Sequence, residues 1–189
     1  MKPEAIQIIR DEHAAIAAVL YSLRALLREI RAGRAKPDFR LLHAILDYIV
    51  SYPNRWHHPK EDQYLFPAVR AATAQADELL ARLAAEHAAG PTLVDSLTRQ
   101  LQAFERGEAG AEAAFADTAE RFTELEWRHM RSEEDELLPL AGRVLGKENW
   151  AEIAQAFREN DNPLFGLKPK EDAERLYQKI LSLAPPLLR

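Results

Sequence analysis

The stretch His57-His58-Pro59-Lys60-Glu61-Asp62-Gln63-Tyr64-Leu65-Phe66-Pro67 decides how the rest of the chain is interpreted. In a helix of about 3.6 residues per turn, His57 and Glu61 point the same way. An imidazole nitrogen and a carboxylate one turn apart are suitable ligands for one transition-metal cluster. The same spacing recurs at His129 and Glu133, again followed by a second acid and by Leu-Leu-Pro. One such pair is weak evidence on a helix surface, but two copies with matching ends predict a metal site.

The composition indicates a helical protein that must hold any metal with histidine and carboxylate. The 189 residues suit one domain, or one domain plus an appendage; 47 % of them are hydrophobic, and only 7 are glycine. The absence of cysteine excludes disulfides, thiolate ligands and iron–sulfur clusters. A net charge of -5 with both signs mixed argues against nucleic-acid or anionic-membrane partners. No apolar run reaches the roughly 18 residues of a membrane span, so we expect a soluble cytoplasmic protein.

Apolar residues at helical spacing, interrupted by glycine and proline, predict the fold. We expect an all-α, up-down-up-down four-helix bundle over residues 1–145 and a C-terminal helical appendage over residues 146–189. The first bundle helix is predicted to end near Gly33. The second is predicted to begin after Asp38, with a kink or restart near Tyr52–Asn54. A turn at Gly107–Gly110 is predicted between the third and the fourth. The appendage is predicted to contain three parts: a short helix from Trp150 to Phe157, a turn-rich joint at Asn160–Gly166, and an amphipathic helix at Pro169–Leu183. It packs on the bundle or forms a dimer surface, so monomer and homodimer both stay open.

Histidines occupy core positions of these stripes. His13 fills the place between Ile9 and Ile16. His87 similarly fills the inward position between leucine 83 and valine 94. The alternative for His13 is a buried histidine bonded to a carbonyl group. His43 has no acid at metal spacing and is interpreted as a surface or boundary residue.

Equal distances from the turns place these histidines at one level of the bundle. With a turn near residue 35, His13 and His57 each lie 22 residues from it; with a turn near 108, His87 and His129 each lie 21 residues from it. Both glutamates then lie about one turn, or ~6 Å, from this layer. A core layer of histidine and glutamate without metal is costly, because buried carboxylates are strongly disfavoured. Six ligands overfill tetrahedral zinc but suit two bridged ions such as iron or manganese.

These motifs together resemble the hemerythrin-like (HHE cation-binding) family over roughly residues 5–145. The resemblance is carried by His13, the 57–67 stretch, Glu86-His87, and the run from His129 to Pro139. It implies a four-helix bundle with a non-haem di-iron site bridged by oxygen and two carboxylates. It also implies roles for six residues. The terminal imidazole ligands would be His13, His57, His87 and His129, and the bridges would be Glu61 and Glu133.

The chain departs from oxygen-carrying hemerythrins in three places. Where the carriers have a further histidine four residues after the one matching His87, this chain has Pro91. That leaves one iron with an open position and makes simple reversible oxygen carriage less expected. The carriers' spacing would select Glu134 as the second bridge, whereas the inward stripe favours Glu133. His58 and Asp62 form a competing pair with the same spacing, turned ~100° away from His57 and Glu61. These two residues are either ligands or groups near the site. His58 is also an alternative occupant of the vacancy.

Three functions remain open from the sequence. The leading hypothesis is a di-iron protein that binds or senses O2, NO or peroxide. The second is a di-iron enzyme of peroxide or nitric-oxide detoxification, or one that releases iron for cluster repair. Repair proteins of this family carry a cysteine-bearing amino-terminal segment, so the last option is disfavoured. The third is a non-redox helical module that holds zinc or manganese, or a bundle that binds a partner.

Overall fold

The computed structural model describes residues 3–158, and these residues form helices joined by short turns, with no strand among them. The α-helices are α1 (Glu4–Arg31), α2 (Phe39–Ser51), α3 (His58–Lys60), α4 (Phe66–Ala72), α5 (Asp77–Glu105), α6 (Ala111–Ser132), α7 (Leu138–Val144) and α8 (Lys147–Arg158). Three π-helical turns, η1 (Pro53–His57), η2 (Glu61–Leu65) and η4 (Glu133–Leu137), and a 3₁₀ turn, η3 (Ala74–Ala76), connect them. The all-helical prediction is therefore confirmed.

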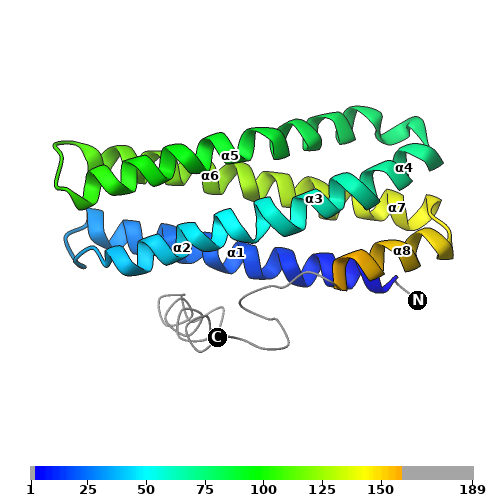
Figure 1. Ribbon diagram of the computed structural model, residues 1–189, viewed down its shortest axis with the longest axis horizontal. Coiled ribbons are helices and arrows are strands. Elements are labelled where there is room, and N and C mark those ends of the chain that lie inside the picture. Colours follow the sequence, from blue (N-terminus) through cyan, green and yellow to red (C-terminus); the bar gives the residue numbers. More distant parts are fainter. Residues whose placement is uncertain (1–2, 159–189) are drawn as a thin grey trace.

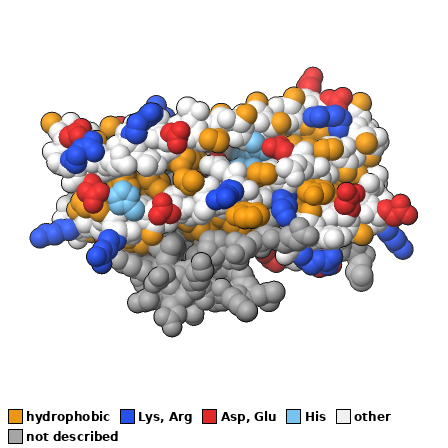
Figure 2. Space-filling model, viewed as in Figure 1, with side chains coloured by type: hydrophobic (Ala, Val, Ile, Leu, Met, Phe, Trp, Pro, Cys, Tyr) orange, Lys and Arg blue, Asp and Glu red, His pale blue; other side chains and the backbone are white. Residues whose placement is uncertain are grey.

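The long helical segments lie side by side along the molecule (Figure 1), and positive and negative side chains are mixed over the face shown in Figure 2. The segment from α2 to α4 runs almost without interruption through η1, α3 and η2, and α6 continues through η4 into α7. Helix α5 packs against α6 and α2, while α1 packs against α6 and α2. Beyond these four long segments, helix α8 lies against α1. The described chain is thus an all-helical bundle in which α8 accompanies the segments that the sequence predicts.

The helix ends follow the predicted punctuation. Helix α1 ends two residues before Gly33, which adopts a φ of 68° that side chains other than glycine rarely adopt. Asp38 caps α2, because its carboxylate accepts a hydrogen bond from the backbone N–H of Leu41 at 3.1 Å. Gly107 and Gly110, with φ of 73° and 76°, form the turn between α5 and α6. The predicted ends near Gly33, after Asp38 and at the Gly107–Gly110 turn are confirmed.

The prolines on the motif-bearing segments produce π-helical turns rather than breaks. A proline cannot donate the hydrogen bond to the fourth residue before it, and its ring crowds that carbonyl. The residue before each proline instead closes a wider turn: the N–H groups of His58, Phe66 and Leu138 donate to the carbonyls of Pro53, Glu61 and Glu133. The kink predicted near Tyr52–Asn54 is thus observed as the start of η1.

Two apolar clusters fill the bundle, and the histidine–glutamate layer lies between them along every long segment. One cluster includes residues 16–30 of α1, 41–52, 94–101 and 115–130. The other includes residues 5–9, 65–69, 76–83 and 137–141, together with α8. On α1, for example, Ile9 belongs to the second cluster, Ile16 to the first, and His13 lies between them. Each side chain of the polar layer is therefore held by rigid apolar packing above and below.

Helix α8 is the part of the predicted appendage that the structure describes. Trp150, Ile153 and Phe157 are buried in the second cluster, as the predicted short helix requires. Arg158 also forms an ion pair with Glu4 at 2.8 Å. The predicted joint at residues 160–166 and helix at 169–183 lie outside the described residues, and the predicted domain boundary at residue 145 stays a prediction. Among residues 3–158, none of the helices is long and apolar enough to cross a membrane.

Candidate metal centre

All six residues predicted as metal ligands meet in the buried layer. They come from four segments of the bundle: His13 from α1, His57 and Glu61 from the η1–η2 segment, His87 from α5, and His129 and Glu133 from the α6–η4 segment. Each of the six is buried, and His57, Glu61 and Glu133 have no exposed surface at all. Glu61 and Glu133 each begin a π-helical turn at the same point after their histidine.

The four histidines form two facing pairs. The Nε2 atom of His13 lies 3.1 Å from Nε2 of His57. The Nε2 atom of His87 lies 2.9 Å from Nε2 of His129. These are the pairs that equal distances from the turns predict.

Each Nδ1 atom, on the far side of its ring, contacts a carboxylate. His57 and His129 contact Glu12 and Glu86 at 2.7 and 2.8 Å. An ionised carboxylate only accepts hydrogen bonds, so each Nδ1 carries the proton and donates. His13 and His87 donate in the same way to Glu134 at 3.0 Å and to Asp62 at 2.9 Å. Such contacts orient metal-binding histidines and leave Nε2 as the free ligand atom.

Glu61 and Glu133 lie between the two histidine pairs. One oxygen of Glu61 is 3.5 Å from Nε2 of His57, and its other oxygen is 3.6 Å from Nε2 of His87. Glu133 does the same, with Oε2 3.3 Å from His13 and Oε1 3.2 Å from His129. All four oxygens are buried and have no hydrogen-bond partner. Each carboxylate therefore presents one oxygen to each pair.

The geometry separates the roles of the two acids that follow His129. Glu133 is fully buried between the pairs, whereas the side chain of Glu134 is 37 % exposed and contacts Nδ1 of His13. Glu133 thus lies between the two histidine pairs, and Glu134 lies behind a histidine. Asp62, in the matching position of the first motif, lies behind His87.

The site has approximate two-fold symmetry. One half contains His13 and His57, backed by Glu134 and Glu12. The other half contains His87 and His129, backed by Asp62 and Glu86; the two halves share Glu61 and Glu133. In both halves a Glu-His dipeptide supplies one ligand to its own half and a carboxylate to the facing histidine. Below we refer to these as the His13 half and the His87 half.

Charges in the layer are distributed so that each half favours one positive charge. Burial opposes the charged form of His13, but the neighbouring carboxylates of Glu133 and Glu134 raise its pKa. Burial lowers the pKa of the facing His57. Burial also disfavours the charged form of His129, but Glu133 and Glu86 raise its pKa to about 9. A proton is therefore favoured on His13 in one half and on His129 in the other. In each half this proton lies between the two facing Nε2 atoms.

The two shared carboxylates, Glu61 and Glu133, also have pKa values shifted in opposite directions. Burial and the neighbouring Glu133 raise the pKa of Glu61 well above its usual value. Burial acts in the same direction on Glu133, but His129 and His13 hold its pKa well below the usual range. Two carboxylates this close resist ionising together, so the layer needs additional positive charge before both are anionic.

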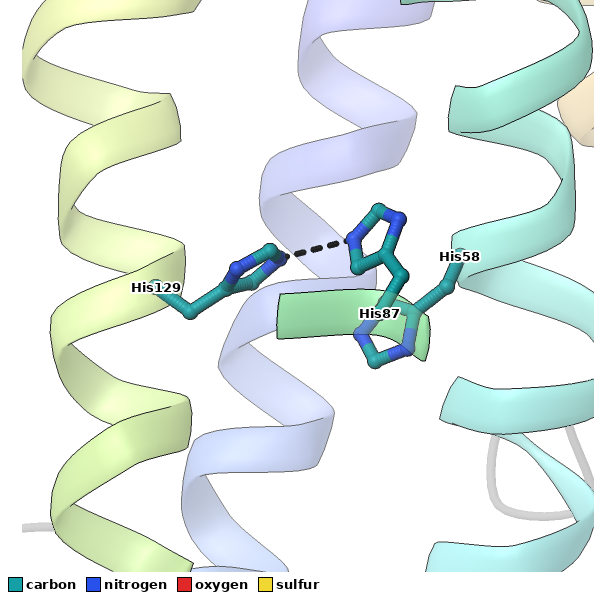
Figure 3. Close-up of side chains that lie close together, drawn as sticks. All are labelled: His58, His87 and His129. Carbon is teal, nitrogen blue, oxygen red and sulfur yellow. Dashed lines mark hydrogen bonds between the residues drawn. The ribbon is translucent and has the colours of Figure 1, made fainter. Parts of the chain in front are cut away.

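His58 is a fifth histidine of the centre and lies in the His87 half. Its ring stacks on that of His87 with centroids 4.2 Å apart and meets the ring of His129 edge-on at 5.4 Å (Figure 3). Burial and the neighbouring His87 lower the pKa of His58 well below its usual value, so its ring is neutral. Its Nδ1 atom is buried without a hydrogen-bond partner, and its Nε2 lies 4.0 Å from Glu126. Burial raises the pKa of Glu126 to about 7.

The two halves differ in the size of the opening that adjoins them. A groove of about 560 Å³ reaches the His13 half, and its lining includes Arg10, His13, Met130, Arg131 and Glu134. A cavity of about 100 Å³ adjoins the His87 half, and its lining includes His58, Gly90, Leu93 and Glu126. Pro91, where the carriers have a histidine, is exposed on α5, and Gly90 faces inward instead.

Sequence reasoning missed the role of Glu12 and gave Glu86 no role beyond the motif. The signal was present, because each directly precedes an inward histidine, but a helical pattern does not show which ring a flanking acid reaches across the bundle. His43 lies apart from the centre, as predicted, and contacts Glu105 at 2.8 Å on the surface.

The fold and the layer together define a class: helical bundles with a buried histidine–carboxylate centre suited to cations. The ligand atoms of His13, His57, Glu61 and Glu133 lie within 4.8 Å of one another, and so do those of Glu61, His87, His129 and Glu133. The family model of the hemerythrin HHE cation binding domain matches residues 4–141. The chain belongs to this family. Searches among curated proteins and among solved structures return no match.

Proposed function

We propose that the centre holds two metal ions, one in each half, bridged by Glu61 and Glu133, and that these ions are iron. The observation that carries the proposal is the orientation of the histidines. Because all four Nδ1 atoms donate to carboxylates, the Nε2 atoms of each pair face one another across 3.1 and 2.9 Å. A metal ion in each half would take the place of the proton between these nitrogens, with one Nε2 ligand from each ring.

The shared carboxylates support the same arrangement. Their four oxygens are buried without partners, which is a costly state for an anion. Two divalent ions satisfy these oxygens as bridging ligands and supply the positive charge that the layer attracts. In the absence of metal, protons on His13 and His129 supply part of this charge, so metal and protons compete for the same places.

The donor set favours iron over the common alternatives. Imidazole and carboxylate ligands suit iron, manganese and zinc, but not copper(I), which prefers sulfur. Two tetrahedral zinc ions would fill all their positions with the two imidazoles and two carboxylate oxygens of each half, and would leave no position for an external ligand. Two bridged octahedral ions use all six residues and keep positions open for an oxygen bridge and an external ligand. The membership of the hemerythrin HHE family agrees with a cation site.

We further propose that the centre binds a small oxidant or diatomic ligand, namely O2, NO or peroxide. Iron supplies an open coordination position and a change of oxidation state when it is bound. The protein supplies the rest: Glu12, Glu86, Asp62 and Glu134 hold the histidines in one orientation. Phe157 of α8 packs edge-on against His57, with ring centroids 6.0 Å apart, and the apolar clusters limit entry of water.

Elemental analysis of the purified protein tests the metal proposal. We expect about two metal ions per chain, mainly iron, and lower occupancy in His13→Ala and His129→Ala. His43→Ala, which alters a histidine outside the centre, retains full occupancy. Absence of metal together with stability that chelators do not change overturns the proposal. Equal losses in all three variants would show general destabilisation rather than ligation. Zinc or manganese as the main metal overturns the assignment to iron.

Spectroscopy of the iron-loaded protein tests the ligand proposal. Azide added to the oxidised form, or nitric oxide added to the reduced form, is expected to change the optical or paramagnetic spectrum. Oxygen is expected to convert the reduced form mainly to the diferric state. Spectra that do not respond to either ligand contradict an open position, and many cycles of oxygen binding and release contradict the expected oxidation. Sustained catalytic consumption of peroxide or NO would instead identify an enzyme.

A further inference from the structure

A cavity of about 100 Å³ lies between α5 and α6, beside the His87 half of the centre. Its apolar lining includes Ala89, Gly90, Leu93 and Leu125. The cavity also has a polar edge, to which His58 and Glu126 contribute, and it reaches the centre at His87 and His129. It is thus a small apolar space that opens onto two of the proposed metal ligands.

We propose that this cavity holds the external ligand of the centre, that the ligand is a small neutral molecule such as O2, NO or hydrogen peroxide, and that His58 donates a hydrogen bond to it. This inference rests on the proposed dinuclear site. It adds the pocket, the charge class of the ligand and a residue that orients the ligand.

The size and lining of the cavity favour a small neutral molecule. A water molecule takes up ~30 Å³ in the liquid, so about 100 Å³ accommodates only a molecule of a few atoms. No lysine or arginine is among the described residues that line the cavity, and Glu126 is an acid. An anion would therefore lose its hydration without gaining a partner of opposite charge. The groove at the His13 half differs, because charged residues such as Arg10 and Arg131 line it.

His58 has an unused hydrogen-bonding group at the polar edge of the cavity. A neutral imidazole has one N–H donor and one acceptor nitrogen. Among the residues that the structure describes, none forms a hydrogen bond with Nδ1 of His58, which is buried. Its Nε2 lies 4.0 Å from Oε2 of Glu126, which is too long for a hydrogen bond. A buried polar atom without a partner is costly, and a polar ligand in the cavity removes that cost.

The orientation of the His58 ring suits this role and not metal ligation. The ring stacks on His87 at an interplanar angle of 15°, with centroids 4.2 Å apart. Ring nitrogens bind a metal in the plane of the ring, so two rings stacked face to face do not bind one ion together. Phe66 also stacks on His87, at 13° and 5.4 Å. These contacts hold the rings in place, and His58 stays available to the cavity.

Gly90 keeps the cavity open. It is the inward residue of α5 one turn after His87, whereas Pro91 is exposed. A Cβ atom built on Gly90 lies 3.3 Å from the side-chain oxygen of Asn54, so larger residues fit poorly there. The space next to His87 that a side chain of α5 could fill therefore stays free for a ligand.

Xenon binding to the metal-free protein tests the pocket. Apolar cavities in proteins stay dry and bind xenon, which reports a space suited to small neutral molecules. We expect crystals under xenon pressure to show an atom in the cavity, and Leu93→Trp to exclude it by filling the space. Leu79→Trp is the matched control, because Leu79 is a partly buried leucine of the same helix that packs in the other apolar cluster. If Leu93→Trp does not fold, Leu125→Trp replaces it.

The NO complex of the iron-loaded protein tests the hydrogen bond. His58→Leu places an apolar residue of similar size beside the ligand. NO should dissociate roughly 2- to 12-fold faster from this variant, as expected for the loss of one hydrogen bond. The N–O stretching frequency should change, and its shift in D2O should disappear. His43→Gln, which alters a surface histidine, should change neither quantity. His58→Leu should also retain both metals, because His58 is not a ligand.

The outcomes separate this inference from the dinuclear site. Absence of xenon from the cavity of the natural protein overturns the pocket, even if the centre holds two metals. Xenon in the cavity of a protein that takes up no metal overturns the dinuclear site, and the ligand role of the cavity with it. An unchanged NO dissociation rate and N–O frequency in His58→Leu overturn the hydrogen bond. Loss of one metal in His58→Leu would make His58 a metal ligand and overturn its role here.

Discussion

The His13 half and the His87 half of the centre are built from the same parts, yet they present different environments to a metal. Each has two histidines whose Nδ1 atoms donate to carboxylates, and both use Glu61 and Glu133. They differ in the ring of His58, in the partly buried acid Glu126 beside it, and in the size of the opening. From this comparison we expect the symmetric parts to define where the proposed cations bind, and the asymmetric parts to determine how each one reacts.

The shared carboxylates should give the largest effect, because each contacts both halves. We expect Glu133→Gln to reduce the metal content from two ions to one or fewer, since a neutral amide does not bridge two cations as a carboxylate does. Glu134→Gln, which alters the adjacent acid behind His13, should retain most of both metals. Elemental analysis and Co²⁺ titration measure the difference. Equal losses in the two variants would contradict the bridging position of Glu133.

Glu126 should make the stability of the metal-free protein depend on pH. Burial raises its pKa from 4.5 to about 7, so its contribution is fully present below pH 4.5 and is lost as the pH rises through 7. Glu126→Gln removes this loss. At pH 8 the variant should therefore be more stable than the natural protein by up to about 3 kcal/mol, and the difference should vanish towards pH 4.5.

Denaturant unfolding in the presence of a chelator measures this difference. Glu124→Gln is the matched control, because Glu124 lies on the same helix with its side chain exposed. A pH-independent gain in Glu126→Gln, or an equal gain in the control, would contradict the buried acid in the His87 half.

The carboxylates behind the histidines should give the smallest effects, and each should act on its own half. Glu12→Gln is expected to weaken metal binding in the His13 half about 10–100-fold, and Glu86→Gln should do the same in the His87 half. The reason is that an amide holds the imidazole N–H less strongly and in less defined orientation. Co²⁺ titration resolves the two events. Loss in the wrong half, or no change in either variant, would contradict the cross-bundle contacts.

The sequence predicted the parts of this centre that depend on spacing along one helix. Equal distances from the turns paired His13 with His57 and His87 with His129, because helices of regular rise keep such residues level. The π-helical turns were not predicted, since a proline indicates lost hydrogen bonds but not how the backbone replaces them. The position of His58 was left open, because a residue turned about 100° from His57 faces solvent or a neighbouring helix depending on packing. The role of Glu12 depends on the same packing across the bundle.

Anomalous diffraction from crystals of the iron-loaded protein tests the central claim most directly. Two bridged metals should appear as two peaks about 3.5–4 Å apart, one beside His13 and His57 and the other beside His87 and His129. Glu61 and Glu133 should lie between the peaks. A single peak held by His58, His87 and His129, with the carboxylates unligated, would contradict the account, and so would the absence of any peak in the layer.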